Sequence, residues 1–182
     1  GVVNIITAHA DRSVAIGKTL CASPIVRHLS FTGSTEVGRI LMAQCAPTVK
    51  KLGLELGGHA PFIVFEDADI DAAVTGAIAS KYRNSGQTCV CANRIYVHKK
   101  VHDAFVEKFS KAVQTIKVGN GMDAGVSQGP LIDQAALEKV ERHIADALGK
   151  GAKLVTGGKP SPLGGTFYEP TILANVTSNM LI

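Results

Sequence analysis

The sequence has few of the features that mark secreted, membrane-spanning or nucleic-acid-binding proteins. Its 182 residues hold only four cysteines, fewer than a secreted disulfide scaffold of this length usually carries. No apolar run approaches the length of a transmembrane helix. The net charge of +4 comes from Lys and Arg scattered among Asp and Glu, without a basic patch interleaved with aromatic residues. We therefore expect reduced thiols and neither a nucleic-acid nor a membrane partner.

What the sequence does contain is an ordinary globular composition, 46% hydrophobic and 19% charged. Apolar runs alternate with stretches of helical periodicity, which predicts an α/β fold. The chain opens without Met in a strand-like run, residues 1–6, and it ends without a polar tail. Both ends are therefore expected to be cuts through a longer protein.

Local patterns give expected bounds for the main elements. The predicted strands cover residues 25–32, 51–56, 61–65 and 94–98, with short ones at 154–155 and 171–173. The predicted helices begin after Ser34 or Thr35, after Asp67 or Asp69, near Val101 and after Asp133, because Ser, Thr and Asp are frequent N-caps. The run 61–65 is apolar throughout, which favours a strand buried on both faces.

Helical spacing predicts which side chains face a core. The expected core positions are Val37, Ile40, Leu41 and Cys45 in the first helix; Ile70, Val74, Ala77, Ile78 and Tyr82 in the second; Val101, Phe105, Phe109, Val113 and Ile116 in the third; and Leu137, Val140, Ile144 and Leu148 in the fourth.

The first motif that suggests chemistry is Phe31-Thr32-Gly33-Ser34-Thr35-Glu36-Val37-Gly38. A strand, a glycine turn and a capped helix place backbone N–H groups at a helix N-terminus, where they suit a pyrophosphate. The motif differs from G-x-G-x-x-G, and taken alone it favours a plain turn between a strand and a helix.

The second motif is Leu54-Glu55-Leu56-Gly57-Gly58, in which Glu55 stands on the strand face opposite the leucines. A carboxylate on a buried strand is costly unless it has a partner or a task, whereas on an edge strand it needs neither. Two glycines then allow another group to come close.

The third motif is Gly86-Gln87-Thr88-Cys89-Val90-Cys91, expected in a loop just after a helix. A loop thiol near backbone donors can act as a nucleophile, whereas two small buried cysteines are the structural alternative. The C-x-C spacing suggests metal, but no second pair and no nearby His accompany it, so we expect no metal site.

Taken together, the order and spacing of these motifs resemble the aldehyde dehydrogenase superfamily. The resemblance continues through Gln128-Gly129-Pro130-Leu131 and 167–171, so it covers essentially the whole chain. The stretch from Lys81 to Asn93 is most similar to succinate-semialdehyde dehydrogenases. His59 is a departure, since that subfamily often has Asn there.

The resemblance implies a role for each motif. Cys89 would attack the aldehyde and form a thiohemiacetal and then a thioester, while Glu55 would activate the hydrolytic water. The Cys89 N–H would form half of the oxyanion hole. Arg83, expected in the final turn of the helix that precedes the thiol motif, would grip the far carboxylate of the substrate; the structural alternative is that it complements the helix C-terminus. Independently of the resemblance, a bent loop would let Cys91 pair reversibly with Cys89. The cofactor, NAD or NADP, would contact Thr32, Gly33, Ser34, Thr35, Glu36, Val37, Gly38 and Leu56.

The resemblance also implies an architecture. Residues 1–56 would end a Rossmann-like cofactor domain, and residues 57–182 would form part of the α/β catalytic domain. Other family residues, among them the second oxyanion donor, would lie outside the chain, so the segment alone is expected to be inactive. The parent protein would be a homo-oligomer, dimer or tetramer, in the cytoplasm or the mitochondrial matrix.

Succinate semialdehyde is the expected substrate, with glutarate semialdehyde or an aliphatic aldehyde as alternatives. A catalytically silent relative that binds nucleotide or serves a structural role is a different kind of alternative. Cys89 and Glu55 argue against that second kind, because a binding-only protein needs neither residue.

Overall fold

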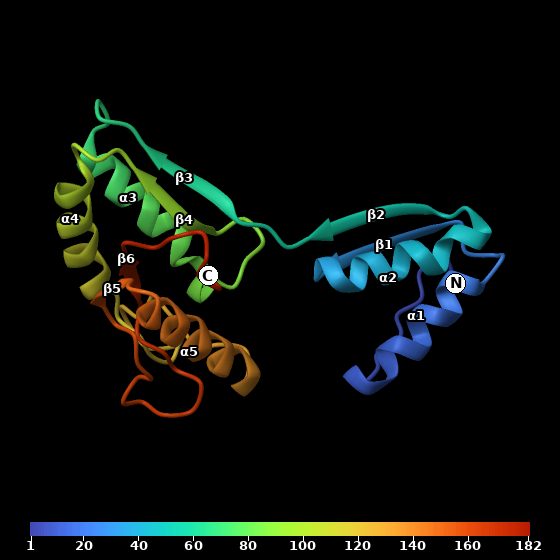
Figure 1. Ribbon diagram of the computed structural model, residues 1–182. Coiled ribbons are helices and arrows are strands. Elements are labelled where there is room, and N and C mark those ends of the chain that lie inside the picture. Colours follow the sequence, from blue (N-terminus) through green and yellow to red (C-terminus); the bar gives the residue numbers. More distant parts are fainter. The chain divides into compact units, whose positions relative to one another are not determined.

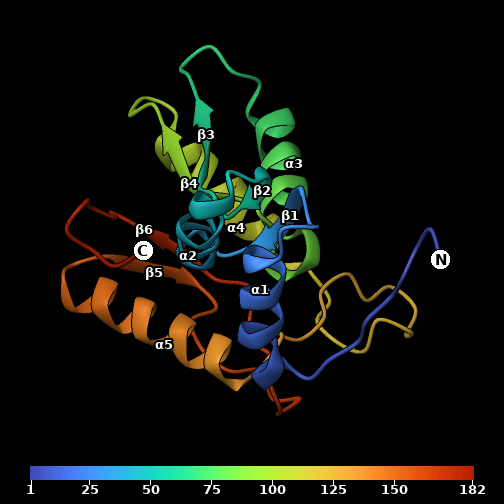
Figure 2. The same ribbon diagram turned by 90° about the vertical axis from the view of Figure 1, so that its right-hand side faces the viewer.

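The computed structural model describes residues 1–182, which divide into two units, Gly1–Gly57 and Gly58–Ile182. Each unit is described by itself. Both contain a strand–helix–strand arrangement with parallel strands (Figures 1 and 2), which confirms the predicted α/β class. No helix is long and apolar enough to cross a membrane.

The first unit is built on the parallel pair β1 (His28–Gly33) and β2 (Lys51–Leu56), joined through α2 (Thr35–Cys45). Helix α1 (Ser13–Ala22) precedes the pair, and short 3-10 helices cover Ala10–Arg12 and Ala46–Thr48. The core of the unit consists of Cys21, Leu41 and Cys45, against which Leu29, Phe31 and Leu52 pack. Both buried cysteines therefore serve packing.

Several expectations for this unit were wrong. Residues 1–6 form no strand, and β1 starts at His28 rather than at residue 25. Val37 and Ile40 of α2 are 40% and 49% exposed, and the buried face of α2 is Gly38, Leu41 and Cys45 instead. The reason is steric, because Gly38 lets α2 lie directly on the Leu56 side chain. A Cβ at Gly38 would be 2.8 Å from that side chain.

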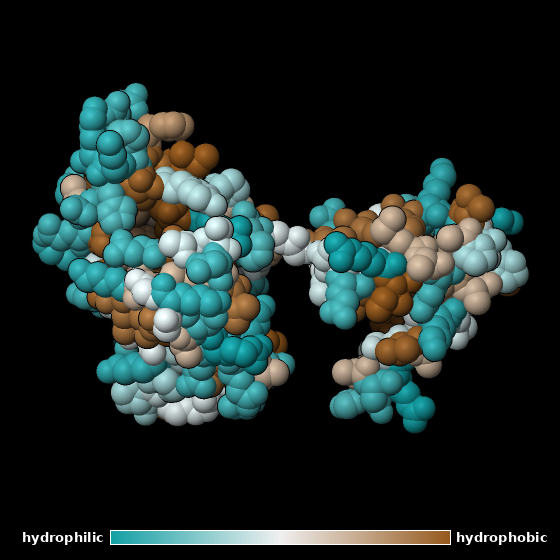
Figure 3. All heavy atoms as spheres, in the orientation of Figure 1, coloured by the Kyte–Doolittle hydropathy of each residue, from teal (hydrophilic) through white to brown (hydrophobic).

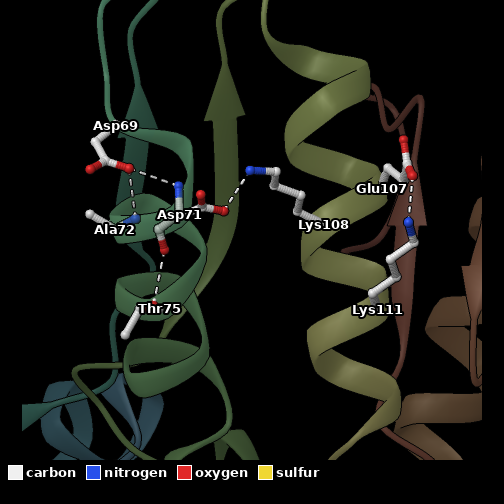
Figure 4. A network of polar contacts seen from close by, with 7 residues as sticks. All are labelled: Asp69, Asp71, Ala72, Thr75, Glu107, Lys108 and Lys111. Carbon is white, nitrogen blue, oxygen red and sulfur yellow. Dashed lines mark hydrogen bonds and ion pairs between the residues drawn. The ribbon is translucent and has the colours of Figure 1, made fainter.

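The second unit begins with a similar arrangement, β3 (Ala60–Val64), α3 (Ile70–Lys81) and β4 (Ala92–Val97), followed by α4 (His102–Gln114). Asp69 caps α3, since its Oδ1 accepts from the N–H groups of Asp71 and Ala72 at 2.9 and 3.1 Å. Figure 4 shows this cap and the ion pair between Asp71 and Lys108 that joins α3 to α4. The pair is exposed, so we assign it little stability.

The core of this unit lies between the two helices and one face of the β3–β4 pair. All predicted positions of the second and third helices pack in this core. The buried side chains of the core are Val64, Val74, Ala77, Tyr82, Phe105, Phe109, Val113 and Ile172, and the predicted positions that are only partly buried against them are Ile70, Ile78, Val101 and Ile116. The Phe105 and Phe109 rings stack with centroids 5.3 Å apart. Burial of such side chains is the main stabilising contribution.

The other face of the β3–β4 pair is uncovered in this chain. Ile63 and Phe65 are 57% and 64% exposed, so the expectation that residues 61–65 are buried on both faces was wrong. Strand alternation explains the error, because Phe62 and Val64 face the helices while Ile63 pairs in register with the exposed Tyr96. Hydrophobic residues also reach the surface in other places (Figure 3).

The unit closes with α5 (Gln134–Gly149) and the antiparallel pair β5 (Lys153–Thr156) and β6 (Ile172–Ala174). Asp133 caps α5 through the N–H of Ala136 at 2.8 Å, as expected. Leu137 and Ile144 pack with Tyr168, and Leu173 of β6 lies against them. Figure 2 shows α5 running alongside β5 and β6. The predicted core position Leu148 is instead 40% exposed.

Tyr82 gives a test of this core. Its ring is buried and its hydroxyl donates to the Thr171 carbonyl at 3.2 Å, while burial raises the pKa of the phenol. Tyr82→Phe should lower the free energy of unfolding by about 1 kcal/mol, because it removes the hydrogen bond and keeps the ring. Tyr96→Phe is the matched control, since Tyr96 is exposed. Urea denaturation of the full-length protein would measure both, and equal losses would contradict this account.

Candidate active site

The chain reverses direction after α3 through a turn of three left-handed residues. Asn84, Ser85 and Gly86 have φ values of 50, 55 and 76°. Only glycine adopts this region without cost, and Asn tolerates it better than Ser does. The helix ends at Lys81, and the left-handed turn follows within the 3-10 segment η3 (Arg83–Gly86), so Cys89 lies in a loop after the helix, as expected.

Side chains of the turn are held by the segment that follows Gln128. Ser85 Oγ donates to the Gly129 carbonyl at 2.9 Å. The side-chain amide of Gln87 acts as both donor and acceptor. Its Nε2 donates to the Pro130 carbonyl at 3.4 Å, and its Oε1 accepts from the Ile132 N–H at 2.8 Å. In the sequence Gln87 stands out only as part of the motif around Cys89. Its structural task is to fasten the thiol-bearing turn to residues 129–132.

Cys89 is the exposed thiol of the chain, and the other three cysteines are buried. Within the turn, the N–H groups of Gln87 and Cys91 donate to backbone carbonyls, whereas the Cys89 N–H donates to none. A free N–H beside an exposed thiol suits an oxyanion donor. Gly58 packs next to this residue, since a Cβ there would lie 3.4 Å from the Cys89 carbonyl oxygen.

Cys91 lies only two residues further on, but it is fully buried. Its Sγ is 2.8 Å from Thr88 Oγ1 and 3.7 Å from the Arg83 carbonyl oxygen. Both thiols are free. The reversible Cys89–Cys91 disulfide therefore stays a prediction, and it would require Cys91 to leave these contacts.

Arg83 was expected in the final turn of α3, and that placement was wrong. The helix ends at Lys81, Tyr82 is its C-cap, and Arg83 is the exposed first residue of η3. Lys81 is the basic residue of the last helical turn. No hydrogen bond or ion pair engages the Arg83 guanidinium within the chain. The alternative that Arg83 complements the helix C-terminus therefore has no contact to support it.

A second set of polar residues beside the turn was not anticipated from the sequence. The Lys81 ammonium donates to Asn93 Oδ1 at 2.6 Å, and Asn93 Nδ2 lies 3.1 Å from Nδ1 of His59. Burial lowers the pKa of Lys81, and the nearby Cys91 thiol partly opposes that effect. The only signal in the sequence was His59, noted as a departure from the subfamily.

In the first unit, Glu55 lies on β2 with its side chain exposed, and Thr32 of β1 is its partner in register. Thr32, Gly33, Ser34, Thr35, Glu36 and Val37 are exposed as well, around the turn from β1 into α2. Ser34 Oγ accepts from the Val37 N–H at 3.3 Å and so caps α2, as expected. Gly38 is buried against Leu56, so within this chain both serve packing.

Glycine at two positions of this turn has a steric reason. A Cβ at Gly33 would overlap the Phe31 ring, and one at Gly38 would overlap Leu56. The turn therefore presents exposed backbone at the positive end of a helix, which fits a phosphate group, although Glu36 in the first turn adds an opposing charge.

An α/β chain that carries an exposed thiol on a braced turn, after a glycine turn into a capped helix, matches one known family throughout. The aldehyde dehydrogenase family model matches residues 1–182, and the chain belongs to this family.

Semialdehyde dehydrogenases are among its relatives. The chain is 62% identical over 182 residues to a glutarate-semialdehyde dehydrogenase of Pseudomonas aeruginosa, covering 100% of this chain and 37% of that protein. It is 59% identical over 179 residues to a succinate-semialdehyde dehydrogenase [NADP(+)] of Escherichia coli, covering 98% and 36%. The crystal structure of succinate-semialdehyde dehydrogenase from Burkholderia pseudomallei superposes with a TM-score of 0.92 at 62% identity, over 96% and 36%. The chain thus spans little more than a third of the length of these relatives.

The two thiols of the turn give a test by oxidation. Mild peroxide should reach the exposed Cys89 first, and a Cys89–Cys91 link should then form only as fast as Cys91 leaves its buried site. Mass spectrometry of the tryptic peptide 84–94 would show the loss of two hydrogens, reversed by reductant. Cys91→Ala is the control, and it should give no intrapeptide link and weaker reversal. Identical behaviour of wild type and Cys91→Ala would remove the redox role of Cys91.

Proposed function

We propose that the full-length protein oxidises a semialdehyde to the corresponding dicarboxylic acid with NAD or NADP, succinate semialdehyde being the first candidate. The observation that carries the proposal is the one exposed thiol, Cys89, which follows a turn fastened to residues 129–132 and whose own N–H has no backbone partner. Membership of the aldehyde dehydrogenase family supports the reaction class.

In the proposed mechanism Cys89 Sγ attacks the aldehyde carbon, and the oxygen that becomes negative accepts a hydrogen bond from the Cys89 N–H. When bound, NAD or NADP supplies the acceptor for the hydride that leaves the thiohemiacetal carbon. The product of that step is a thioester on Cys89. Glu55 then takes a proton from water, which attacks the thioester carbon and releases the acid and the thiol.

The first unit contains the residues that would hold the cofactor. The exposed N-terminal turn of α2 offers the N–H groups of Ser34, Thr35 and Glu36 to a phosphate, while the Val37 N–H donates to the Ser34 cap, and Thr32 at the end of β1 is exposed beside it. Gly38 and Leu56 would contribute indirectly, by keeping α2 close to β2. We propose on this basis that residues 1–56 belong to a cofactor domain and residues 57–182 to a catalytic domain.

The exposed side chain of Arg83 favours a substrate that carries a carboxylate at the end away from the aldehyde. Its guanidinium is exposed and unpaired, and its backbone belongs to η3, which ends shortly before the thiol. A planar guanidinium matches a carboxylate with two parallel hydrogen bonds. Both curated relatives act, by their names, on semialdehydes, which favours a charged substrate over a simple aliphatic aldehyde.

Assembly and location stay predictions. We expect a homo-oligomer, dimer or tetramer, located in the cytoplasm, with the mitochondrial matrix as the alternative.

The division of labour between Cys89 and Glu55 can be tested in the full-length protein. Cys89→Ala should abolish aldehyde oxidation and leave nucleotide binding within about twofold of wild type, because the thiol acts only on the substrate. Glu55→Gln should instead give a burst of reduced cofactor followed by slow turnover, because hydrolysis of the thioester loses its base. Stopped-flow absorbance separates the two phases. Full steady-state turnover in Glu55→Gln would refute the general-base role.

The role of Arg83 can be tested with paired substrates. Arg83→Ala should lower kcat/KM for succinate semialdehyde by about 1.5–3 kcal/mol, roughly 10- to 150-fold, because the charged hydrogen bonds to the carboxylate are lost. Butanal, uncharged and of similar length, should barely respond. Arg142→Ala, an exposed Arg on α5, is the matched control and should change neither value. Equal losses with both substrates would show that Arg83 is structural.

A further inference from the structure

Two glycines, Gly86 and Gly58, lie close to the backbone of Cys89. Hydrogen bonds connect a residue beside the first glycine with the residue that follows the second. Gly86 packs on Lys81, since a Cβ at Gly86 would lie 3.0 Å from the Lys81 Nζ. Gly58 packs on the Cys89 carbonyl, and His59 follows Gly58 directly. Asn93 at the start of β4 joins Lys81 to His59. These contacts link the two glycines on either side of the Cys89 backbone.

The chemistry of Lys81 fixes the direction of the hydrogen bonds. A lysine ammonium has three donors and no acceptor, so Asn93 must turn its carbonyl oxygen toward Nζ, 2.6 Å away. The amide NH2 of Asn93 then faces His59 Nδ1 at 3.1 Å and donates to it. His59 Nδ1 must therefore be an acceptor, which places the proton of the neutral imidazole on Nε2.

Asn93 and His59 are exposed, whereas Lys81 is half-buried. The half-burial of Lys81 explains why the hydrogen bonds keep one direction at this site. A hydrogen bond between two exposed neutral groups competes with water and orders little. An ammonium withdrawn from water needs an acceptor, and Asn93 Oδ1 is the one that the chain supplies. The charge-assisted bond is the stronger of the two, so it sets the orientation of the amide.

We infer that Lys81 is a positioning residue that acts through Asn93 and His59 to hold Gly58 against Cys89. Gly58 lies beside the Cys89 carbonyl oxygen, since a Cβ at Gly58 would be 3.4 Å from it, and the orientation of the Cys89 residue determines where its free N–H points. The relay of Lys81, Asn93 and His59 therefore fixes the oxyanion donor from one side, while Gln87 and Ser85 brace the turn from the other. The catalytic part of this inference rests on the proposed function.

The relay itself can be tested without any activity, by nitrogen-15 NMR of the His59 ring in the full-length protein at about pH 8, where imidazole is neutral. The wild type should show Nε2–H as the single tautomer. Lys81→Met should give a mixture, because Asn93 is then free to turn over, and Lys81→Arg should restore the single tautomer. A tautomer ratio that is the same in wild type and Lys81→Met would overturn the relay.

Asn93→Asp provides an independent variant in case Lys81→Met fails to fold. The carboxylate keeps an acceptor for Lys81 but has no proton to donate, so His59 must donate from Nδ1 instead. The Nδ1–H signal should therefore replace the Nε2–H signal. Retention of the Nε2–H tautomer in Asn93→Asp would show that the two side chains do not interact.

The effect on the thiol-bearing turn can be read by amide hydrogen exchange of the segment 84–94. Lys81→Met and His59→Leu should each speed exchange by about fivefold, because the turn opens more often. The double variant should exchange no faster than the faster single variant, because both remove the same relay. His59→Asn should match wild type, since an Asn oxygen can accept from Asn93. Additive effects in the double variant would overturn the inference.

Turnover of succinate semialdehyde gives the last measurement. Lys81→Met should lower kcat about tenfold and change KM by less than about twofold, because the relay positions the oxyanion donor and does not touch the substrate. Lys81→Arg should recover most of the loss. A wild-type protein without aldehyde turnover would refute the proposed function, while the NMR and exchange results would still decide on the relay.

Discussion

The left-handed turn from Asn84 to Gly86 is the constraint on which the candidate site depends. Outside glycine such a conformation costs on the order of 1–2 kcal/mol per residue, so it persists only where other contacts hold it. The contacts that hold it come from Ser85, which binds Gly129, and from Gln87, which binds Pro130 and Ile132. The backbone of residues 129–132 therefore provides the hydrogen-bond partners that hold the turn. The Gln128-Gly129-Pro130-Leu131 motif thus has a structural role.

The same turn separates two thiols that the sequence places side by side. Chain reversal before residue 87 sends Cys89 outward and Cys91 inward, where Thr88 and the Arg83 carbonyl contact its sulfur. Exposure and the free N–H at residue 89 suit a nucleophile, whereas burial at residue 91 suits packing. Spacing in the sequence alone gave no means of distinguishing the two.

The parts of the fold that follow from local chemistry were predictable. The caps Ser34, Asp69 and Asp133 and the apolar stripe of α4 were identified from residue type and spacing, because each depends on contacts a few residues apart. The exposed face of β3 was not, because strand alternation and an apolar run conflict there and long-range packing decides. Helix α1 was missed, and its pattern is weakly amphipathic.

In the candidate site, too, some features could be predicted from local sequence and others could not. The motifs around Glu55 and Cys89 were visible as patterns, while the tasks of Gln87, Lys81 and Asn93 were not. Each of these three side chains acts across a long sequence separation, Gln87 on residues 130 and 132 and Asn93 on His59. A motif shows which residue types occur together, but not which backbone group a side chain will reach.

The two glycines of the β1–α2 turn are needed for packing, and a phosphate site at this turn would depend on the same packing. Gly33 leaves room for the Phe31 ring, and Gly38 lets α2 approach the Leu56 side chain. The N-terminus of α2 offers its N–H groups in a fixed place only because the helix lies close on the strands. A side chain at Gly38 would move the helix and, with it, any phosphate site at the N-terminus of the helix. The glycine can therefore determine cofactor binding without touching the cofactor.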